Sequence, residues 1–396
     1  MSSDSAVVEQ IPVGSVHAGV PAPAAPPEPT RRRPRLYVLD GLRLIAALAV
    51  VGWHYAGIER DTSIWGGRVS AIMPKLHVLA AYGWTGVELF FLISGFVICM
   101  SSWGRPLGHF VNSRITRLFP AYWFSVLLIA AVTFYARAPW SKDVLKGSYS
   151  SVITNMTMMQ EGLGVPDIDG VYWTLWVELR FYVLFGLLAI GGLTYRKVVS
   201  FCGSWLVLAI VAAGSKLPLL DFFFFPRYAP YFIAGVALYM IHRFGSNLLL
   251  WGIVGFSWLL AQDQLRYIVA DYYWQKISYN VSFTIITVMF VVMIGVAVGW
   301  FDWVRWRWLA TAGALTYPLY LVHEQLGWHV IHHFHGRVNA YVLVGALVVG
   351  MLAFAWLIHR LIEQPTAIAL RRGLRGALID LRDRDRGKNE TAGTSG

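Results

Sequence analysis

The sequence predicts an all-α integral membrane protein with about ten spanning helices. Three observations lead to this fold class: a composition that is 57% hydrophobic and 14% charged, a series of long uncharged segments, and an alternation of charge between successive loops. Two soluble domains would fit into 396 residues, but a mean hydropathy of +0.53 argues against them.

Ten segments are long enough, with their flanks, to provide the ~20 residues that cross a ~30 Å hydrocarbon layer. Two of them, Tyr228–Ile241 and Leu309–Ile331, contain polar residues. The other eight have uninterrupted apolar cores: Leu44–Trp53, Val87–Cys99, Tyr122–Tyr135, Val183–Leu193, Val198–Gly214, Leu248–Ala261, Val281–Gly299 and Tyr341–Leu357.

Two tails flank the membrane domain, which is predicted over residues 36–364. Residues 1–35 are rich in Pro, Ala, Ser and Glu and lack the apolar core of a cleaved signal peptide, so a disordered cytosolic tail is expected. Residues 365–396 carry many arginines and predict a second charged cytosolic tail.

Positive charge alternates between the two sets of loops, which predicts the orientation in the cell membrane. The set that includes both termini is basic, whereas the other set is mixed or acidic, so both termini are expected in the cytosol. This topology accounts for the net charge of +11, and no basic helix with interleaved aromatic residues indicates nucleic-acid binding. The basic set comprises Arg31, Arg32, Arg33, Arg35, Arg105, Arg114, Arg117, Arg196, Lys197, Arg243, Arg305, Arg307 and the C-terminal arginines.

No metal site is expected. The two cysteines, Cys99 and Cys202, lie inside apolar stretches and offer neither a disulfide framework nor a thiolate cluster. His329 and His333 are four residues apart and could share a helix face, but no third ligand is evident outside the same turn. The histidine-rich segment is therefore interpreted as an outer loop.

The first span carries an arginine and a histidine, Arg43 and His54, eleven residues apart. Eleven helical steps leave about 20° between the two side chains and about 16 Å between their positions, so both are expected to face one cavity. Asp40 lies on the same face. The alternative is structural: an interfacial Asp40–Arg43 pair and a hydrogen-bonded histidine near the outer headgroups.

Four more ionisable residues are predicted at the depth of His54 in the outer half of the membrane, on three other spans: Glu88, Glu178, His323 and Glu324. A neutral imidazole beside a carboxylate is suited to taking a proton from a hydroxyl group. Because no GxSxG nucleophile motif is present, direct transfer with His54 as the general base is the simplest interpretation.

A basic motif follows the second span. Arg114 and Arg117 in RITRLFP are three residues apart at the cytosolic edge, and guanidinium groups on one turn suit the phosphates of a nucleotide-like carrier. The alternative is contact with anionic lipid, which juxtamembrane arginines often make.

Five motifs, in order, resemble the acyltransferase 3 family of membrane acyltransferases. The resemblance extends over about residues 36–364 and includes an arginine, ten residues and then a histidine in the first span. The motifs are LDGLRLIAALAVVGWHY (39–55), GVELFFLISGFVI (86–98), RITRLFPAYW (114–123), WTLWVELRFY (173–182) and YPLYLVH (317–323).

The resemblance implies transfer of an acyl group from acyl-coenzyme A to a hydroxyl of a sugar or of a glycosylated metabolite. Arg43 and His54 would be the essential pair, with His54 as base. Arg114 and Arg117 would contact the donor, and Glu178 would support the site.

Two positions depart from the family pattern: Glu88 stands where Asp is frequent, and Arg180 stands where a second carboxylate or a glutamine is usual. The chain is also expected to lack the soluble C-terminal domain of many surface-polysaccharide acetylases, and this compact form is similar to members that acylate macrolides.

A proton-coupled carrier is the main alternative from another class, since buried histidines and carboxylates also build proton relays. A carrier would be expected to have helices broken near the middle of the membrane, whereas Pro120, Pro226, Pro230 and Pro318 are expected to lie mostly near span ends. A non-catalytic scaffold would leave the buried ionisable groups without a role.

Overall fold

A computed structural model describes residues 35–136, 138–141, 149–215, 217–272 and 274–373. Within these ranges the chain contains helices, turns and loops and no strand, which confirms the predicted all-α polytopic membrane fold. The predicted tail 1–35 lies almost wholly outside the described residues, and the predicted tail 365–396 lies largely outside them. The last described helix runs past the predicted boundary at 364 and continues to residue 373.

Helix α1 (Tyr37–Gly52) ends in a π-helical turn (Trp53–Gly57), and the short α2 (Val69–Ile72) and α3 (Pro74–Ala80) lead to α4 (Gly86–Ser102). Next come α5 (Leu107–Ala136), α7 (Tyr149–Asn155) and α8 (Trp173–Leu188), which a 3-10 turn (Gly170–Tyr172) opens. The chain continues through α9 (Tyr195–Ser215), α10 (Pro218–Phe224), α11 (Ala229–Phe244), α12 (Leu248–Asp271) and α13 (Tyr279–Ala297). It closes with α14 (Trp308–Phe334) and α15 (Ala340–Ile358), followed by a second π turn (His359–Glu363).

Local sequence explains several helix starts. The side chain of Asn247 accepts a hydrogen bond from the Leu250 N–H at 3.0 Å and caps α12, and Asn339 caps α15 in the same way. Pro218 and Pro230 occupy the first turns of α10 and α11, where a missing N–H costs little.

Eight described helices are long and apolar enough to cross a membrane, compared with the ten spans predicted. The other two predicted spans are α11 and α14. α11 has 16 residues and packs against α4, α9, α12 and α13, while α14 has 27 residues and packs against α1, α5 and α15. Both therefore run among the apolar spans, and the polar residues in the middle of α14, such as His323, Glu324 and Gln325, are buried inside the bundle.

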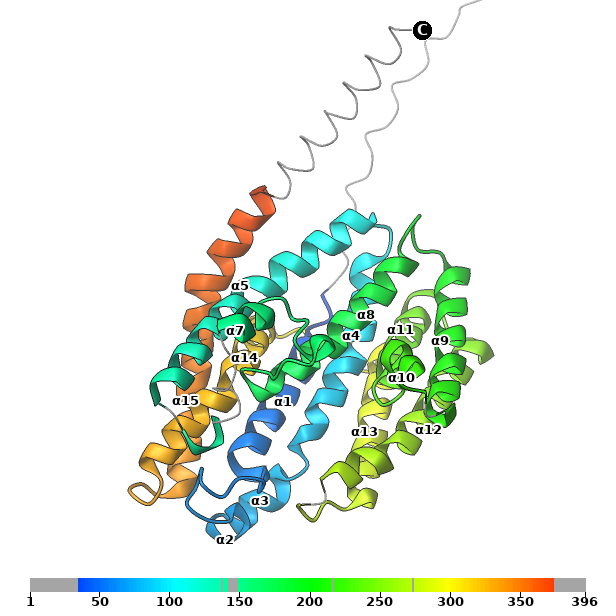
Figure 1. The fold of residues 1–396 in the computed structure, drawn as a ribbon. Coiled ribbons are helices and arrows are strands. Elements are labelled where there is room, and N and C mark those ends of the chain that lie inside the picture. Colours follow the sequence, from blue (N-terminus) through cyan, green and yellow to red (C-terminus); the bar gives the residue numbers. More distant parts are fainter. Residues whose placement is uncertain (1–34, 137, 142–148, 216, 273, 374–396) are drawn as a thin grey trace, which may run out of the picture. The chain divides into compact units, whose positions relative to one another are not determined.

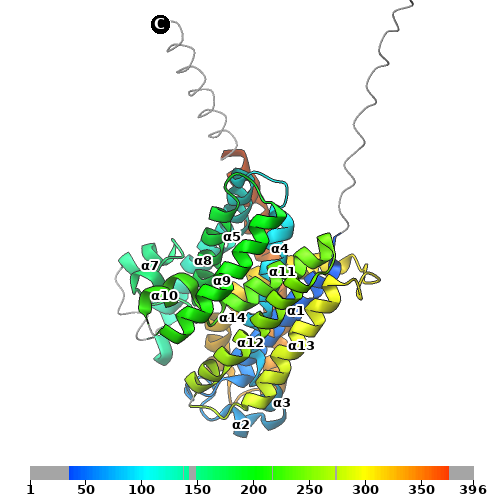
Figure 2. The same ribbon diagram turned by 90° about the vertical axis from the view of Figure 1, so that its right-hand side faces the viewer.

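The middle of the bundle is formed by α1, α4 and α14, with α12 and α13 on one side and α15 on the other (Figure 1; Figure 2 gives the view turned by 90°). The backbones of α4 and α11 touch at Gly95 and Gly235. A Cβ atom at Gly95 would lie 2.2 Å from the Phe232 carbonyl oxygen, and one at Gly235 would lie 2.1 Å from that of Leu92. Such close packing through small residues is typical of helix pairs in membranes.

Two prolines lie inside long helices rather than near span ends, contrary to the sequence-based expectation. Pro120 is in the middle of α5 and Pro318 is in the first half of α14, and both helices continue through them. The bundle around these helices supports the turns that a proline weakens.

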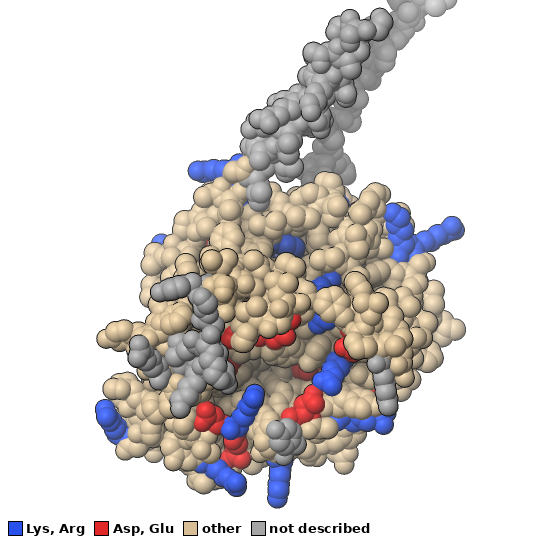
Figure 3. Space-filling model, viewed as in Figure 1, with Lys and Arg blue, Asp and Glu red and all other residues tan. Residues whose placement is uncertain are grey.

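One face of the molecule is hollowed near its middle, where acidic and basic side chains come together (Figure 3). Around this hollow, wide areas carry neither kind of charge, as a surface in contact with lipid requires.

Candidate active site

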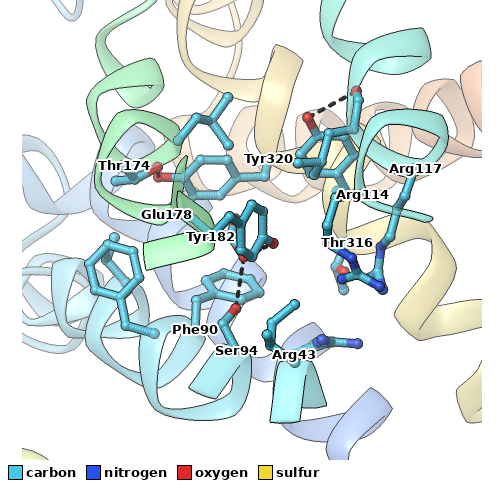
Figure 4. Close-up of a pocket in the computed structure, with 16 residues that line it drawn as sticks. Arg43, Phe90, Ser94, Arg114, Arg117, Thr174, Glu178, Tyr182, Thr316 and Tyr320 are labelled. Atoms are coloured by element: carbon cyan, nitrogen blue, oxygen red, sulfur yellow. Dashed lines mark hydrogen bonds between the residues drawn. The ribbon is translucent and has the colours of Figure 1, made fainter. Parts of the chain in front are cut away.

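Three arginines from two helices line one side of a cavity of about 700 Å³, which we call the arginine cavity (Figure 4). Arg43 comes from α1, and Arg114 and Arg117 come from α5. Figure 4 shows the three guanidinium groups gathered on the same side, and Arg117 lies close enough to Arg43 for their charges to repel. The remaining lining comes from α4, α5, α8 and α14: Val87, Phe90, Phe91, Ser94, Ile98, Leu118, Thr174, Leu175, Glu178, Tyr182, Thr316, Tyr317 and Tyr320.

Glu178 lies across this cavity from the arginines. Its Oε1 accepts hydrogen bonds from the Ser94 hydroxyl at 2.9 Å and from the Tyr182 hydroxyl one turn further along α8. The guanidinium group of Arg114 lies 6.0 Å from the centre of the Tyr182 ring. The three arginines outnumber the two carboxylates whose charge acts on Arg43, Asp40 and Glu178, and the remaining positive charge suits a ligand with several phosphates.

His54 lies in the π-helical turn at the end of α1, where the wider turn frees backbone carbonyls from their usual partners. Side-chain donors from other parts of the chain reach four successive carbonyl oxygens in this turn. They are the Trp328 indole to His54 at 2.9 Å, the Trp65 indole to Tyr55 at 2.9 Å, the His77 ring to Ala56 at 3.0 Å and the Gln275 amide to Gly57 at 2.7 Å. The backbone that carries His54 is therefore fixed from several directions.

His54 and His323 contact each other, and backbone carbonyls fix the hydrogens on both rings. The Nδ1 atom of His54 lies 3.0 Å from the Val50 carbonyl oxygen, and that of His323 lies 2.9 Å from the Tyr320 carbonyl oxygen. Because a carbonyl oxygen only accepts, each Nδ1 must carry a hydrogen. In the neutral rings, the single Nδ1–H of His54 is shared between the Val50 carbonyl oxygen and Nε2 of His323 at 3.0 Å, and Nε2 of His54 keeps a free lone pair.

A pair of carboxyl groups lies next to that free nitrogen. Oε2 of Glu324 is 3.4 Å from Nε2 of His54, and the Glu324 and Asp169 side chains are hydrogen-bonded to each other. Two carboxyl groups can share such a bond only when one of them carries the proton. Burial raises the pKa of Asp169 to about 7, which favours a shared proton near neutral pH. Gly170 permits the approach, since a Cβ atom there would lie 2.6 Å from Oε1 of Glu324.

His54 opens onto a second cavity of about 440 Å³, the histidine cavity. Glu88, in the first turn of α4, lines the same space and is 2% exposed. The rest of the lining is largely aromatic: Val50, Trp53, Trp84, Val87, Val171, Trp173, Tyr228, Ile268, Tyr272 and Tyr320.

The two cavities adjoin, because Val87 and Tyr320 line both. The Tyr320 hydroxyl is held at this junction by Thr174 at 2.9 Å. Since the Thr174 hydroxyl also donates to the Val171 carbonyl oxygen at 2.9 Å, Tyr320 is the donor to Thr174. Arg43 and His54 thus face two adjoining cavities rather than the one that helical spacing predicted.

The predicted site residues fall into two groups. Arg43, Arg114 and Arg117 come together as expected. His54 and Glu88 line the histidine cavity, and His323 and Glu324 contact the His54 ring. The prediction that Glu178 lies beside His54 is wrong, because its carboxylate belongs to the arginine cavity.

The reason for that error is the segment before α8. Ile168 and Asp169 are buried, so the chain already lies inside the bundle before α8 begins. Glu178 is hydrogen-bonded to Ser94, which is six residues, or about 9 Å along α4, further from the start of that helix than Glu88.

Sequence reasoning missed Asp169, which directly precedes the turn that opens α8. Its signal was the Asp169–Gly170 pair directly before the acidic motif, since an aspartate followed by glycine often marks a tight turn at a helix start. Arg180, which departs from the family pattern, faces neither cavity: it lies 4.7 Å from the ring centre of Phe225 and donates to the Phe222 carbonyl oxygen at 3.1 Å.

The histidines near the end of α14 are helical rather than in an outer loop as predicted. The Nδ1 atoms of His329 and His332 donate to the carbonyl oxygens of Gln325 at 2.6 Å and Ser63 at 2.8 Å. Among the described residues, no group of three or more His, Cys, Asp or Glu side chains is arranged to hold a metal ion.

Comparison with known proteins gives the same family as the sequence motifs. A family model described as an acyltransferase domain matches residues 36–360. The chain is similar to acyltransferase MdmB of Streptomyces mycarofaciens, with 28% identity over 160 residues that cover 39% of each protein. It is also similar to peptidoglycan O-acetyltransferase OatA of Listeria monocytogenes, with 24% identity over 173 residues that cover 39% of this chain and 24% of that one.

These alignments span well under half the length of either relative, and no solved structure matches the chain. The family model, in contrast, covers nearly the whole described membrane domain with its arginines, histidines and carboxyl groups. The chain therefore belongs to the acyltransferase 3 family of integral membrane acyltransferases.

Proposed function

We propose that the protein is an O-acyltransferase that moves an acyl group from acyl-coenzyme A to a hydroxyl of a sugar or of a glycosylated metabolite such as a macrolide. The observation that carries the proposal is the pair of adjoining cavities, one lined by three arginines and the other by His54. The relatives support it in kind, since one is named an acyltransferase and the other a peptidoglycan O-acetyltransferase.

The donor would bind with its phosphates at Arg43, Arg114 and Arg117 and extend its pantetheine arm past Tyr320. Arg43 and His54 are eleven residues apart, about 16 Å along a helix, which is a span that an extended arm can cover. The thioester would then reach the histidine cavity while the charged head stays among the arginines.

At the histidine cavity, Nε2 of His54 would take the proton of the acceptor hydroxyl, and the oxygen would attack the thioester carbonyl carbon. The new ester C–O bond forms as the C–S bond breaks, and the leaving thiolate takes the proton from the imidazolium. His323 and Glu324 would orient the ring, and Glu324 would stabilise its charged form. Glu88 would belong to the acceptor half of the site.

We also propose that both termini face the cytosol and that the donor enters from that side. The excess of arginine and lysine in one set of loops supports this orientation. Arg114 and Arg117, from the same set, would meet cytosolic coenzyme A directly.

The function is tested by incubating membranes that contain the protein with radiolabelled acetyl- and isovaleryl-coenzyme A and a panel of glycosylated acceptors. His54→Ala is compared with wild type and with His333→Ala, a matched control at an exposed histidine near the end of α14. We expect label in one acceptor with wild type and His333→Ala but not with His54→Ala. Full transfer by His54→Ala would show that the proposed base is wrong.

A further inference from the structure

The histidine cavity contains a carboxyl group without a partner. Glu88 is 2% exposed, and among the described residues its Oε2 has no hydrogen-bond partner and the side chain forms no ion pair. Arg227 belongs to the segment before α11 that also supplies Tyr228 to the lining, but it is already paired with Asp271 at 2.6 Å. A buried carboxylate is costly unless a positive charge or hydrogen-bond donors compensate it.

Glu88 lies in the first turn of α4, where the helix dipole offsets part of the cost of a negative charge. Burial in a largely apolar cavity opposes the charged form, so a carboxylate here needs further compensation. A cation bound at Oε2, which has no partner among the described residues, would supply that compensation.

The walls around Glu88 are aromatic on several sides. Trp53 and Trp84 both pack on Tyr272, with ring centres 5.3 Å apart in each case, and Trp173 packs on Tyr228 at 5.2 Å. Faces of tryptophan and tyrosine rings attract cations, and a box of such rings is a common site for substituted ammonium groups. The indole N–H of Trp84 also lacks a hydrogen-bond partner among the described residues and can donate to a ligand oxygen.

We infer that Glu88 and the surrounding aromatic rings bind a protonated amine on the acceptor, next to the hydroxyl group that His54 deprotonates. The acceptor class is then a basic glycoside, such as an amino sugar or a compound that carries one. This inference rests on the proposed function for its assignment of the histidine cavity to the acceptor.

A neutral sugar would fit this chemistry less well. It can stack on the indole rings and donate hydroxyl hydrogen bonds to Glu88, but it offers a carboxylate no opposite charge. An ammonium group compensates the charge and contacts the rings at the same time.

The test measures binding without any acyl donor, on the full chain in lipid nanodiscs. The probes are methyl glucosaminide, its N-acetylated form and methyl glucoside, which share a ring and differ in charge. The variants are Glu88→Gln and the control Glu59→Gln, in which an outer-loop carboxylate that accepts from the Ser70 N–H at 2.8 Å loses the same charge. Choline and its uncharged isostere 3,3-dimethylbutanol provide a second comparison on wild type alone, should Glu88→Gln fail to fold.

We expect wild type and Glu59→Gln to bind the charged member of each pair about tenfold or more tightly than the neutral one. Glu88→Gln should bind the charged and the neutral probes about equally. Equal binding of charged and neutral probes by wild type, or an unchanged preference in Glu88→Gln, would overturn the inference. If the preference is present but no acceptor is acylated from acyl-coenzyme A, the amine site stands and the proposed transfer fails.

Discussion

The arginine cavity and the histidine cavity are neighbours, yet they are built for different tasks. The arginine cavity is lined by long side chains of like charge, which can adjust to the phosphates of a flexible ligand. The histidine cavity instead holds its imidazole by a capped π turn, a second histidine and a carboxyl pair, so that one nitrogen lone pair has a fixed direction. Positive charge suffices to hold the phosphates of the acyl donor, whereas proton transfer requires fixed geometry.

The substitution expected to have the largest effect, and to separate the two cavities most clearly, is at His54. We expect His54→Ala to lower acyl transfer by about 10²- to 10⁴-fold, the usual contribution of a general base, while coenzyme A binding stays within about twofold of wild type because the arginines are unchanged. Turnover in nanodiscs and calorimetric binding of coenzyme A measure the two effects separately. Equal losses in both would mean that the cavities are not distinct in function.

Arg43→Lys should have the opposite signature. A lysine keeps the charge but loses the planar fork, so we expect the KM for acyl-coenzyme A to rise about tenfold while kcat changes less. Arg180→Lys is the matched control, since Arg180 packs on Phe225 outside both cavities and should leave the donor KM unchanged. A fall in kcat without a change in KM would place Arg43 with the reacting atoms instead.

Glu178→Gln sharpens the comparison, because residue counting grouped this carboxylate with His54. Glutamine can still accept from Ser94 and Tyr182 but adds no negative charge opposite the arginines. We expect a donor KM about threefold lower, with the pH dependence of kcat unchanged. A shift in the pH dependence of kcat with an unchanged donor KM would indicate that Glu178 acts together with His54.

Asp169→Asn should give the smallest effect, seen in stability. The pKa of Asp169 is raised to about 7 by burial, from about 3.9 in an unfolded chain, so its protonation stabilises the fold at low pH and this contribution is lost as the pH rises from about 4 to about 7. Asparagine does not titrate. The melting temperature of Asp169→Asn relative to wild type should therefore increase by about 2 °C or more between pH 5 and pH 8.

Asp302→Asn, at an exposed carboxylate, provides the control for that measurement. Its melting temperature should follow wild type at every pH. A pH-independent difference between Asp169→Asn and wild type would contradict the buried, proton-sharing carboxyl pair.

Much of the fold follows from the sequence, because apolar length and loop charge directly reflect the bilayer. The arginine group was also predictable, since Arg114 and Arg117 lie on one helical turn and Arg43 lies near the same end of the first span. Counting residues along the helices also predicted that Glu88, His323 and Glu324 lie near His54, as the structure shows.

The remaining features depend on irregular backbone that periodicity does not describe. Asp169 was missed and Glu178 was misplaced because the segment before α8 enters the bundle. The π turn that orients His54 has no periodic signal in the sequence, and two of the donors to its carbonyl oxygens, Trp328 and Gln275, are distant in the chain. Only the three-dimensional contacts reveal these partners.

The central claim is that a donor held by the arginines delivers its thioester to His54. The most direct measurement is photocrosslinking with an acyl-coenzyme A whose acyl end carries a diazirine, followed by mapping of the adducts by mass spectrometry. We predict adducts at Trp53, Trp84 or Trp173, which line only the histidine cavity, and their loss when excess coenzyme A competes. Adducts confined to Ile98, Leu118 or Thr316, which line only the arginine cavity, would contradict the claim.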